Sequence, residues 1–445
     1  MKKIILSILV FILCAVNVYA KNNKDLDLVS VIKDFGADKE SIAISIKNAQ
    51  TGENIYSINE KALMNPASVQ KILTMPAAID TLGTDYKFKT EIYSSGKDSC
   101  LIKLSGDPYL KSSDLKTLVS GLKPEVQTVY IDSSILDDKT WGEGWQWDDD
   151  MNILMPRFGA YNLDKNIIKL TILPEENGKL AQIINTTKYP LLFFNQVRTS
   201  NKTSLDIKRD MSVSANTIML NGTVARPTTV YIPVNNIKRY FEVQLTQALE
   251  NRKMYLKNPY KTKLKDSADM LENSVEHDIE FALSDILKNS NNMAAETVFK
   301  LAGGKYKGNV TGTDTLGIEM FNSFCKKLKI DNSSVKITDG SGVSKNNLVN
   351  ADFVSEYLNA IKNNPAVRYL PSPGEGTLTQ RLLPIKNNLK AKTGTLSGIS
   401  SIAGYITARS GKSYTFCIIQ NDVKLTAPEK KQLEDTIIKE MYLKL

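Results

Sequence analysis

The middle of the chain constrains the fold most, because it consists of short β-forming runs while the segments on either side carry helical patterns. Between Glu91 and Val243 the β-branched residues recur in separate short runs, at 128–131, 167–173 and 228–233. With 445 residues, the chain is too long for one compact core. We therefore expect an α/β (α+β) protein of two or three domains, one of them mostly β.

The N-terminal residues predict an export signal. A basic start, Met1–Lys3, precedes the apolar run Ile4–Val16, and Val18–Ala20 ends in a small residue suited to signal-peptidase cleavage. The apolar run is shorter than a comfortable membrane span. We expect a signal peptide over residues 1–20, cleaved after Ala20, and secretion across the inner membrane into the periplasm. An uncleaved anchor is the alternative.

The chain is basic, with a formal net charge of +9, which becomes +7 (9 − 2) once Lys2 and Lys3 leave with the signal. No later run is long and apolar enough to cross a bilayer. Such a protein is expected to make at most peripheral contact with a membrane or another anionic surface, and the charge is equally consistent with solubility alone. Nucleic acid is not expected as a partner.

The cysteine and histidine content excludes several kinds of site. Cys100, Cys325 and Cys417 are scattered and form no C-x-x-C pair, so neither a disulfide framework nor a zinc cluster is expected, and one pairing among the three stays open. Cys417 lies in an apolar run and is expected to be a buried packing residue. The single histidine, His277, lies in a charged, helical-looking segment and is expected to be solvated. Because no G-x-S-x-G elbow occurs either, a hydrolase of this sequence would use lysine or a carboxylate as its base.

The stretch Asn65–Thr74 places Ser68 three residues before Lys71, at the start of a helical pattern that follows a predicted hairpin (42–46 and 55–58). Side chains at i and i+3 of a helix share a face, about 5–6 Å apart at Cβ, so the amine can reach the hydroxyl. Free backbone N–H groups at the helix start can hold a developing oxyanion. The spacing alone means little, because it recurs at Ser113/Lys116, Ser120/Lys123, Ser323/Lys326 and Ser333/Lys336. A serine cap followed by a solvated lysine is the alternative.

Two further segments carry related chemistry. Ser290–Asn292 is a short polar break between two helical runs, which suits the presentation of a hydroxyl and an amide. Lys392–Thr395 has the sequence Lys-Thr-Gly-Thr and lies in a predicted strand, in which alternate side chains share a face. The two threonines would then face a substrate carboxylate with the lysine behind them. Gly394 would leave the backbone open, so that an extended substrate could lie along the strand.

The order Ser-x-x-Lys, Ser-x-Asn, Lys-Thr-Gly resembles the penicillin-binding proteins and serine β-lactamases. The finer resemblance is to the class C low-molecular-mass penicillin-binding proteins, the D-alanyl-D-alanine carboxypeptidase/endopeptidases of peptidase family S13. Further segments that are similar to this family lie at 105–110, 144–149, 339–344 and 374–378. About 220 residues separate Ser68 from Ser290, which is more than a compact catalytic domain needs at that point.

The resemblance implies a penicillin-binding transpeptidase-like domain with a central antiparallel sheet flanked by helices, interrupted by mostly-β inserted domains. The catalytic domain is expected to comprise residues 21–88 and 272–445, and the insertion residues 89–271. The C-terminal segment begins with a capping box at Thr426 and is predicted to form a helix that packs against the catalytic sheet rather than on a membrane.

The resemblance also implies roles for individual residues, with Ser68 as the nucleophile and Lys71 as its base. The pKa of Lys71 would be lowered by desolvation and by the positive charge of Lys392. Ser290 would pass a proton to the leaving amine, and Asn292 would hold a substrate amide. The Ser68 and Thr395 N–H groups would form the oxyanion hole, and the substrate carboxylate would be bound by Lys392, Thr393, Gly394 and Thr395. No metal or organic cofactor is required.

The expected substrates are peptidoglycan stem peptides, with β-lactams as covalent inhibitors. Asp148 would pair with a free ammonium of the stem peptide, and Lys345 would contact a carboxylate at a position where relatives often carry arginine. The chain departs from the family in having Asn291, where aspartate is usual. One alternative is a serine β-lactamase, for which Glu319 and Asn322 superficially suggest a deacylating site, although 317–329 fits a plain amphipathic helix better. The other alternative is a non-catalytic peptidoglycan-binding protein.

Overall fold

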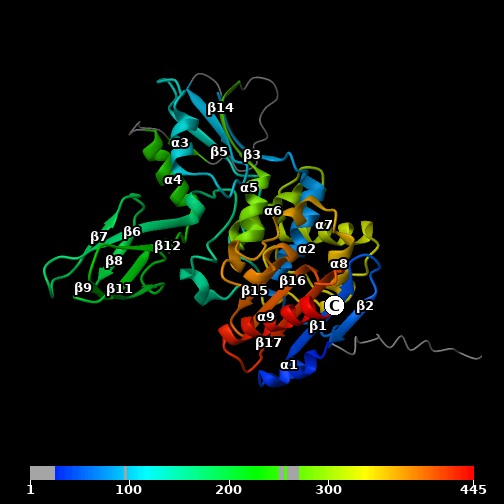
Figure 1. The fold of residues 1–445 in the computed structure, drawn as a ribbon. Coiled ribbons are helices and arrows are strands. Elements are labelled where there is room, and N and C mark those ends of the chain that lie inside the picture. The colour runs from blue at the N-terminus through cyan, green and yellow to red at the C-terminus, as the bar shows by residue number, and fades with distance from the viewer. Residues whose placement is uncertain (1–25, 95–97, 250–254, 258–269) are drawn as a thin grey trace, which may run out of the picture.

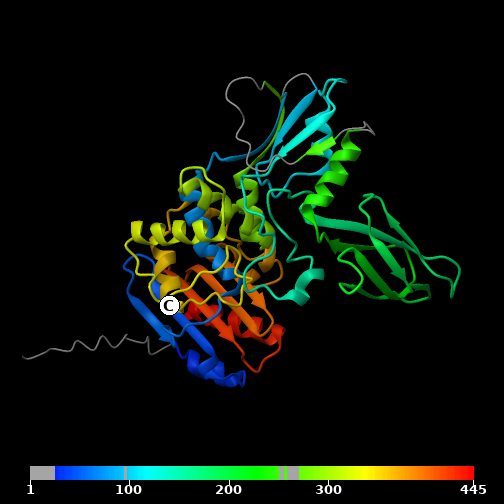
Figure 2. The ribbon, with the colours of Figure 1, turned by 180° about the vertical axis from the view of Figure 1, so that it is seen from behind.

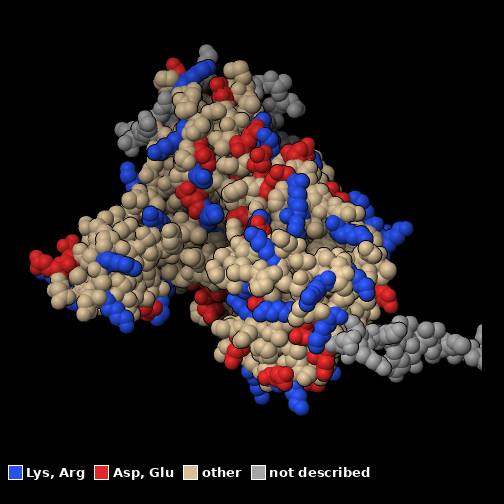
Figure 3. All heavy atoms as spheres, viewed as in Figure 1, with Lys and Arg blue, Asp and Glu red and all other residues tan. Residues whose placement is uncertain are grey.

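The structure is a computed structural model that describes residues 26–94, 98–249, 255–257 and 270–445. The predicted signal peptide at 1–20 lies outside the described residues, as does most of the basic stretch 252–265. None of the helices in the described part of the chain is long and apolar enough to span a membrane. Lys and Arg do not gather into one patch on the face drawn in Figure 3, where they are interspersed with Asp and Glu.

A five-stranded antiparallel sheet, in the order β15-β16-β17-β1-β2, forms the centre of the larger lobe (Figure 1). Its strands are β1 (Ile42–Asn48), β2 (Asn54–Ile58), β15 (Leu389–Leu396), β16 (Ile399–Thr407) and β17 (Ser413–Asn421). The predicted hairpin is confirmed as β1 and β2. Because β1 pairs with β17 along its full length, the two ends of the chain build one sheet.

Helices cover both faces of this sheet. On one face, α8 packs on β1, β16 and β17, and the other helices of this face pack around α2 and α6. These helices are α2 (Gln70–Leu82), α5 (Ile279–Lys288), α6 (Asn292–Tyr306), α7 (Asp314–Lys327) and α8 (Ala351–Ala360). On the other face lie α9 (Ala427–Lys444), which packs on β16, and α1 (Leu28–Asp34), which packs on α9. The predicted capping box of Thr426 and Glu429 starts α9, and the packing of this helix against the sheet is confirmed.

The insertion contains a second five-stranded sheet, in the order β13-β5-β4-β3-β14, with α3 against β3 and β14. These elements are β3 (Lys87–Ser94), β4 (Ser99–Lys103), β5 (Thr128–Asp132), β13 (Tyr255–Lys257), β14 (Leu271–Asp278) and α3 (Ser112–Val119). Since β14 pairs with β3, this sheet extends to Asp278, and the boundary predicted at 271/272 falls inside it.

Two smaller sheets complete the insertion as a separate lobe, seen at the left of Figure 1 and from behind in Figure 2, and α4 links this lobe to the β3–β5 sheet by packing on α3. One has the order β12-β6-β7, and in the other β11 lies between β10 and β8 and also pairs with β9. The elements are β6 (Ile167–Leu173), β7 (Gln182–Asn185), β8 (Leu192–Asn195), β9 (Arg198–Thr199), β10 (Ser204–Arg209), β11 (Thr217–Val224), β12 (Thr228–Pro233) and α4 (Ile237–Ala248). The predicted fold class, a helix-flanked antiparallel sheet interrupted by mostly-β modules, is confirmed.

One local prediction in this region is wrong. His277 lies in β14 rather than in a helical segment, because the segment pairs with β3 in the sheet. Its Nδ1 lies 2.5 Å from Oδ2 of the buried Asp107, so the ring is hydrogen-bonded to a carboxylate rather than simply solvated. This contact raises the pKa of His277, and partial burial opposes the rise.

Cys100, Cys325 and Cys417 are buried and free. Burial raises the pKa of each thiol. Cys417 lies in β17 among core residues, as its apolar surroundings predict.

Candidate active site

Ser68 lies on a tight turn that leads into α2. The single 3₁₀ turn Ala67–Val69 precedes the helix, and Ala67 has a left-handed backbone with φ of 45°. The N–H of Ala67 donates to Oδ1 of Asn65 at 2.9 Å, which helps to hold this unfavourable conformation. Gly342 closes over the turn, because a Cβ at that position would lie only 2.0 Å from the Ala67 carbonyl oxygen.

Lys71 is completely buried, and its Nζ lies 2.9 Å from Ser68 Oγ. The amine also donates to Asn292 Oδ1 at 2.7 Å and to the Ser341 carbonyl oxygen at 2.6 Å. A neutral amine has two N–H donors and one lone pair. Since both donors are occupied by these acceptors, the lone pair of neutral Lys71 faces the Ser68 hydroxyl, which can then donate its proton.

Burial lowers the pKa of Lys71 to about 7, against the opposing effect of the Asp339 and Glu296 carboxylates. The Lys392 amine, which was also expected to lower the pKa of Lys71, repels it when both are protonated, and burial together with this repulsion holds the pKa of Lys392 well below its ordinary value. Two buried amines in one cleft disfavour simultaneous protonation, which supports an uncharged base.

Two buried carboxylates beneath Lys71 were missed from the sequence. Glu296 accepts from the Gly340 and Ser341 N–H groups at 3.0 and 2.8 Å, and burial raises its pKa to about 8. Asp339 accepts from the Ser344 N–H at 2.6 Å and from the Trp145 indole at 3.0 Å. The four-residue spacing from Asn292 to Glu296, which puts both on one helix face, was the available signal.

Ser290 lies in the short break between α5 and α6 and carries the hydroxyl group predicted there. Its backbone is left-handed, with φ of 63°. Its Oγ accepts from Lys392 Nζ at 2.9 Å. The buried Asp285 holds this break, because its carboxylate accepts from the side-chain amides of Asn289 and Asn291, both at 2.8 Å. Tyr109 from the insertion donates to the same carboxylate at 3.0 Å, which ties the break to the neighbouring domain.

Asn292 is the first residue of α6 and is buried. Its Nδ2 donates to the Leu154 carbonyl oxygen at 2.8 Å while its Oδ1 accepts from Lys71. A cavity of about 190 Å³ opens beside Ser290 and Asn292 and reaches Lys165 of the insertion.

The Lys-Thr-Gly-Thr segment forms part of β15, the edge strand of the central sheet. The Ala391 N–H donates to the Pro371 carbonyl oxygen, away from β16. Because N–H groups alternate in direction along a strand, those of Thr393 and Thr395 also point to the free edge. The Thr393 hydroxyl donates to the Thr377 hydroxyl at 2.7 Å.

Gly394 serves a different purpose from the one predicted. A Cβ at this position would lie 2.3 Å from Ser401 Oγ, 2.7 Å from the Pro66 carbonyl oxygen and 2.9 Å from the Ser68 nitrogen. The glycine therefore lets β15 approach the Ser68 turn, rather than leaving room for substrate above the strand.

The structure does not bring Asp148 and Lys345 into the hydrogen-bonded cluster around Ser68. Both side chains are exposed, and neither forms an ion pair within the described residues. Their segments are adjacent, since the Lys345 N–H donates to the Gly144 carbonyl oxygen at 3.4 Å. The tryptophans nearby divide into two kinds: Trp145 packs against Trp141, whereas Trp147 is 85% exposed.

The fold and the cluster of Ser68, Lys71, Ser290 and Lys392 have the arrangement expected of a serine hydrolase. Comparison with known proteins agrees. The model of the D-Ala-D-Ala carboxypeptidase 3 (S13) family matches residues 24–441. The chain belongs to this family, and the family predicted from the motifs is confirmed.

Individual relatives are distant but similar along most of their length. The D-alanyl-D-alanine carboxypeptidase of Actinomadura sp. strain R39 is 25% identical, over 90% of this chain and 81% of that protein. D-alanyl-D-alanine carboxypeptidase DacB of Haemophilus influenzae is 26% identical, over 90% of this chain and 91% of that protein. The crystal structure of penicillin binding protein 4 (dacB) from Haemophilus influenzae has a TM-score of 0.80 at 24% identity, covering 94% of this chain and 99% of that one, and it shows the same fold.

Proposed function

We propose that this protein is an exported, penicillin-sensitive serine D-Ala-D-Ala carboxypeptidase, DD-endopeptidase or both, which acts on peptidoglycan stem peptides through an acyl-enzyme at Ser68. The observation that carries the proposal is the fully buried Lys71 amine at 2.9 Å from Ser68 Oγ, with its pKa lowered to about 7. Membership of the S13 family and the names of the relatives support the substrate class.

In acylation, Ser68 Oγ attacks the carbonyl carbon between two D-alanines while its proton passes to neutral Lys71. The carbonyl oxygen takes the negative charge and is held by the N–H groups of Ser68 and Thr395. The free edge of β15, together with Lys392 and the hydroxyl groups of Thr393 and Thr395, suits a terminal carboxylate of the substrate.

Collapse of this intermediate breaks the C–N bond. Ser290 gives its proton to the leaving nitrogen and regains one from the Lys71 ammonium by way of Lys392, whose Nζ lies 2.9 Å from Ser290 Oγ, so Lys71 is neutral again. Water then attacks the ester and gives a proton to Lys71, which passes it to Ser68 Oγ as that oxygen leaves. These steps balance without a metal or an organic cofactor.

The predicted signal at residues 1–20 supports export to the periplasm, where such a substrate would lie. We propose the predicted division into a catalytic domain (21–88 and 272–445) and an insertion (89–271), with both boundaries moved to the outer ends of β3 and β14, so that the insertion runs from Lys87 to Asp278. We also assign Asp148 and Lys345, exposed on adjacent segments, to contacts with the stem peptide beyond the scissile bond.

The test is digestion of purified muropeptides with the wild type and Ser68→Ala side by side, together with labelling by a fluorescent penicillin. We expect release of D-alanine, cleavage of cross-links or both from the wild type, and neither products nor label from the variant. Label that survives Ser68→Ala would instead support a non-catalytic binding protein.

The same preparations separate the proposal from a β-lactamase. Glu319, which superficially suggested a deacylating carboxylate, lies on α7 and pairs with the exposed Lys307. Rapid, repeated turnover of nitrocefin by the wild type would favour the β-lactamase, whereas a slow single round of labelling supports the peptidase.

A further inference from the structure

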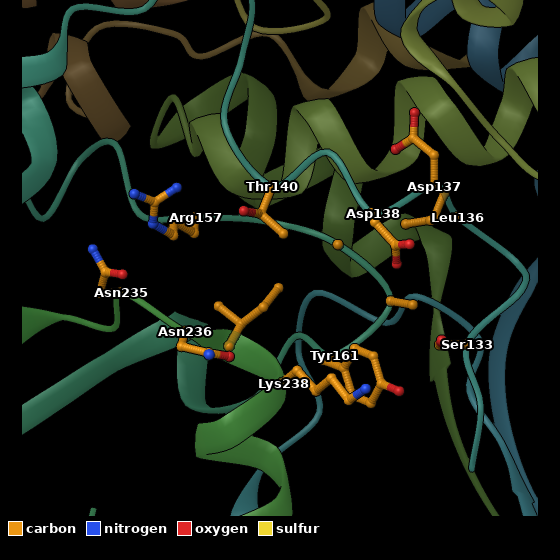
Figure 4. Close-up of a pocket in the computed structure, with 13 residues that line it drawn as sticks. Ser133, Leu136, Asp137, Asp138, Thr140, Arg157, Tyr161, Asn235, Asn236 and Lys238 are labelled. Atoms are coloured by element: carbon orange, nitrogen blue, oxygen red, sulfur yellow. The ribbon is translucent and has the colours of Figure 1, made fainter. Parts of the chain in front are cut away.

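A second cavity, larger than the one beside Ser290, lies where the insertion meets the catalytic helices (Figure 4). Its volume is about 480 Å³, and it is bounded by the segments 133–140, 157–161 and 235–238. The first segment is attached to the catalytic domain, because Asp137 Oδ1 accepts from Lys300 Nζ of α6 at 2.7 Å. The third leads from β12 into α4. The volume falls within the range of small-ligand sites, about 300–1,000 Å³.

Arg157 stands at one end of this cavity beside Asn235. Its guanidinium lies 5.1 Å from the centre of the Trp141 ring, and the side chain is half-buried. Within the described residues it forms no ion pair. Burial and the positive charge of Arg209 lower the pKa of Arg157, and Asp150, which opposes this effect, is itself held by Arg209 at 2.8 Å.

Leaving a partly desolvated guanidinium without a carboxylate partner costs free energy, and stacking on tryptophan offsets only part of that cost. The planar fork of Arg matches a carboxylate of a ligand, and the neighbouring Asn235 amide can supply a further donor. This end of the cavity is therefore complementary to an anion.

The opposite end carries the other sign of charge. Asp138 and Ser133 lie there, across the cavity from Arg157, while Tyr161 and Lys238 line the lower side (Figure 4). Asp138 is exposed, and no ion pair of its carboxylate occurs in the described part of the chain. Its neighbour Asp137 is neutralised by Lys300, so Asp138 is the carboxylate available to a ligand.

We propose that this cavity is a second, non-catalytic binding site for a short peptide with a free carboxylate and a free ammonium group, with Arg157 binding the carboxylate and Asp138 the ammonium. Trimmed stem peptides carry both groups, and this identification of the source rests on the proposed function. The segment between Trp141 and Arg157 also supplies the Leu154 carbonyl that holds Asn292, so the two sites share one loop.

The experiment titrates the tripeptide L-alanyl-γ-D-glutamyl-L-lysine, which lacks a scissile D-Ala-D-Ala bond, into the Ser68→Ala protein by calorimetry. We expect binding that Arg157→Gln weakens by about tenfold or more, as for a lost charged hydrogen bond. The matched control is Arg226→Gln, which should retain the wild-type affinity. Arg226 is exposed and lies outside the cavity, where its carbonyl oxygen accepts a hydrogen bond from the Thr228 hydroxyl. Asp138→Asn should weaken binding of the tripeptide but not of its form with an acetylated lysine side chain and amino terminus.

Absence of binding, or binding that is kept in Arg157→Gln and lost in Lys392→Ala, would overturn the proposal, because the peptide would then occupy no site or only the catalytic cleft. If Arg157→Gln does not fold, the peptide with its carboxylates amidated replaces the variant and should bind the parent protein about tenfold more weakly or worse. Failure of penicillin labelling at Ser68 would count against the proposed function. It would not affect the test of the second site, because the tripeptide titration does not depend on labelling.

Discussion

The pKa of Lys71 leads to a quantitative prediction for the acylation of Ser68. Burial lowers this pKa from 10.5 to about 7, which corresponds to a preference of about 5 kcal/mol for the neutral amine at about 1.36 kcal/mol for each pH unit. Only neutral Lys71 can accept the proton of Ser68. The rate of acylation should therefore follow the neutral fraction, rising as pH increases and half-maximal near pH 7.

The assay is the second-order rate constant for acylation by benzylpenicillin, measured by stopped flow between pH 5 and 9. With a pKa of about 7, the rate at pH 6 should be about a tenth of the plateau and the rate at pH 8 about nine-tenths of it. A lysine at its ordinary pKa of 10.5 would be less than about 1% neutral even at pH 8. The pH profiles expected for a Lys71 pKa of about 7 and for one of 10.5 therefore differ clearly between pH 5 and 9.

Lys71→Arg should remove the rise and lower acylation by about 10²–10⁴-fold, because arginine stays protonated throughout. The matched control is Lys326→Arg, at the same spacing from Ser323 but exposed on α7, which should leave the profile unchanged. A wild-type rate that is flat from pH 5.5 to 8.5, or a midpoint above pH 9, would refute the assignment of Lys71 as the neutral base.

Three further predictions concern the surroundings of Ser68. Gly394→Ala should lower penicillin labelling by about tenfold or more, since its Cβ would lie 2.9 Å from the Ser68 nitrogen; Gly121→Ala, with no atom within 4 Å, is the control, and equal labelling of the two would contradict this role. Asp285→Ala should lower kcat about 10–100-fold with less effect on KM, because it releases the break that carries Ser290, and a change in KM alone would speak against it. Lys71→Met tests how much the buried amine lowers the free energy of unfolding. A lysine whose folded pKa is depressed binds fewer protons folded than unfolded between about pH 7 and 10.5, so wild-type stability should rise relative to the variant by about 1.4 kcal/mol per pH unit in that window and stay constant below it. Parallel urea-unfolding stabilities from pH 7.5 to 9.5 would be inconsistent with that effect.

The local sequence pattern predicts secondary structure correctly where a segment determines its own conformation. The hairpin of β1 and β2 follows from alternation and a turn-rich link, and α9 follows from the capping box at Thr426. The motif at Ser290–Asn292 was placed between two helices because apolar periodicity marks both of them. These predictions hold because hydrogen bonds and side-chain spacing within a few residues decide them.

Where the local sequence pattern predicts the wrong structure or role, contacts between distant segments are the reason. His277 is in a strand because β14 pairs with β3, where its partner Phe88 lies 189 residues earlier in the chain (277 − 88), and sheet pairing overrides the helical appearance of the segment. Gly394 is required by the close approach of β15 to the Ser68 turn, which no property of β15 alone reveals.

The chemical groups of the site and their order can be read from the amino-acid sequence: an alcohol and an amine one helical turn apart, a second hydroxyl with an amide, and a lysine on a strand. The protonation state of the amine depends on the folded cleft. Lys71 is buried by segments that lie more than 220 residues away in the chain. These segments also supply the two acceptors that occupy its N–H groups and the nearby carboxylates of Glu296 and Asp339. A pKa depends on the dielectric and the charges that surround a group in space, so it is a property of the folded cleft rather than of the motif.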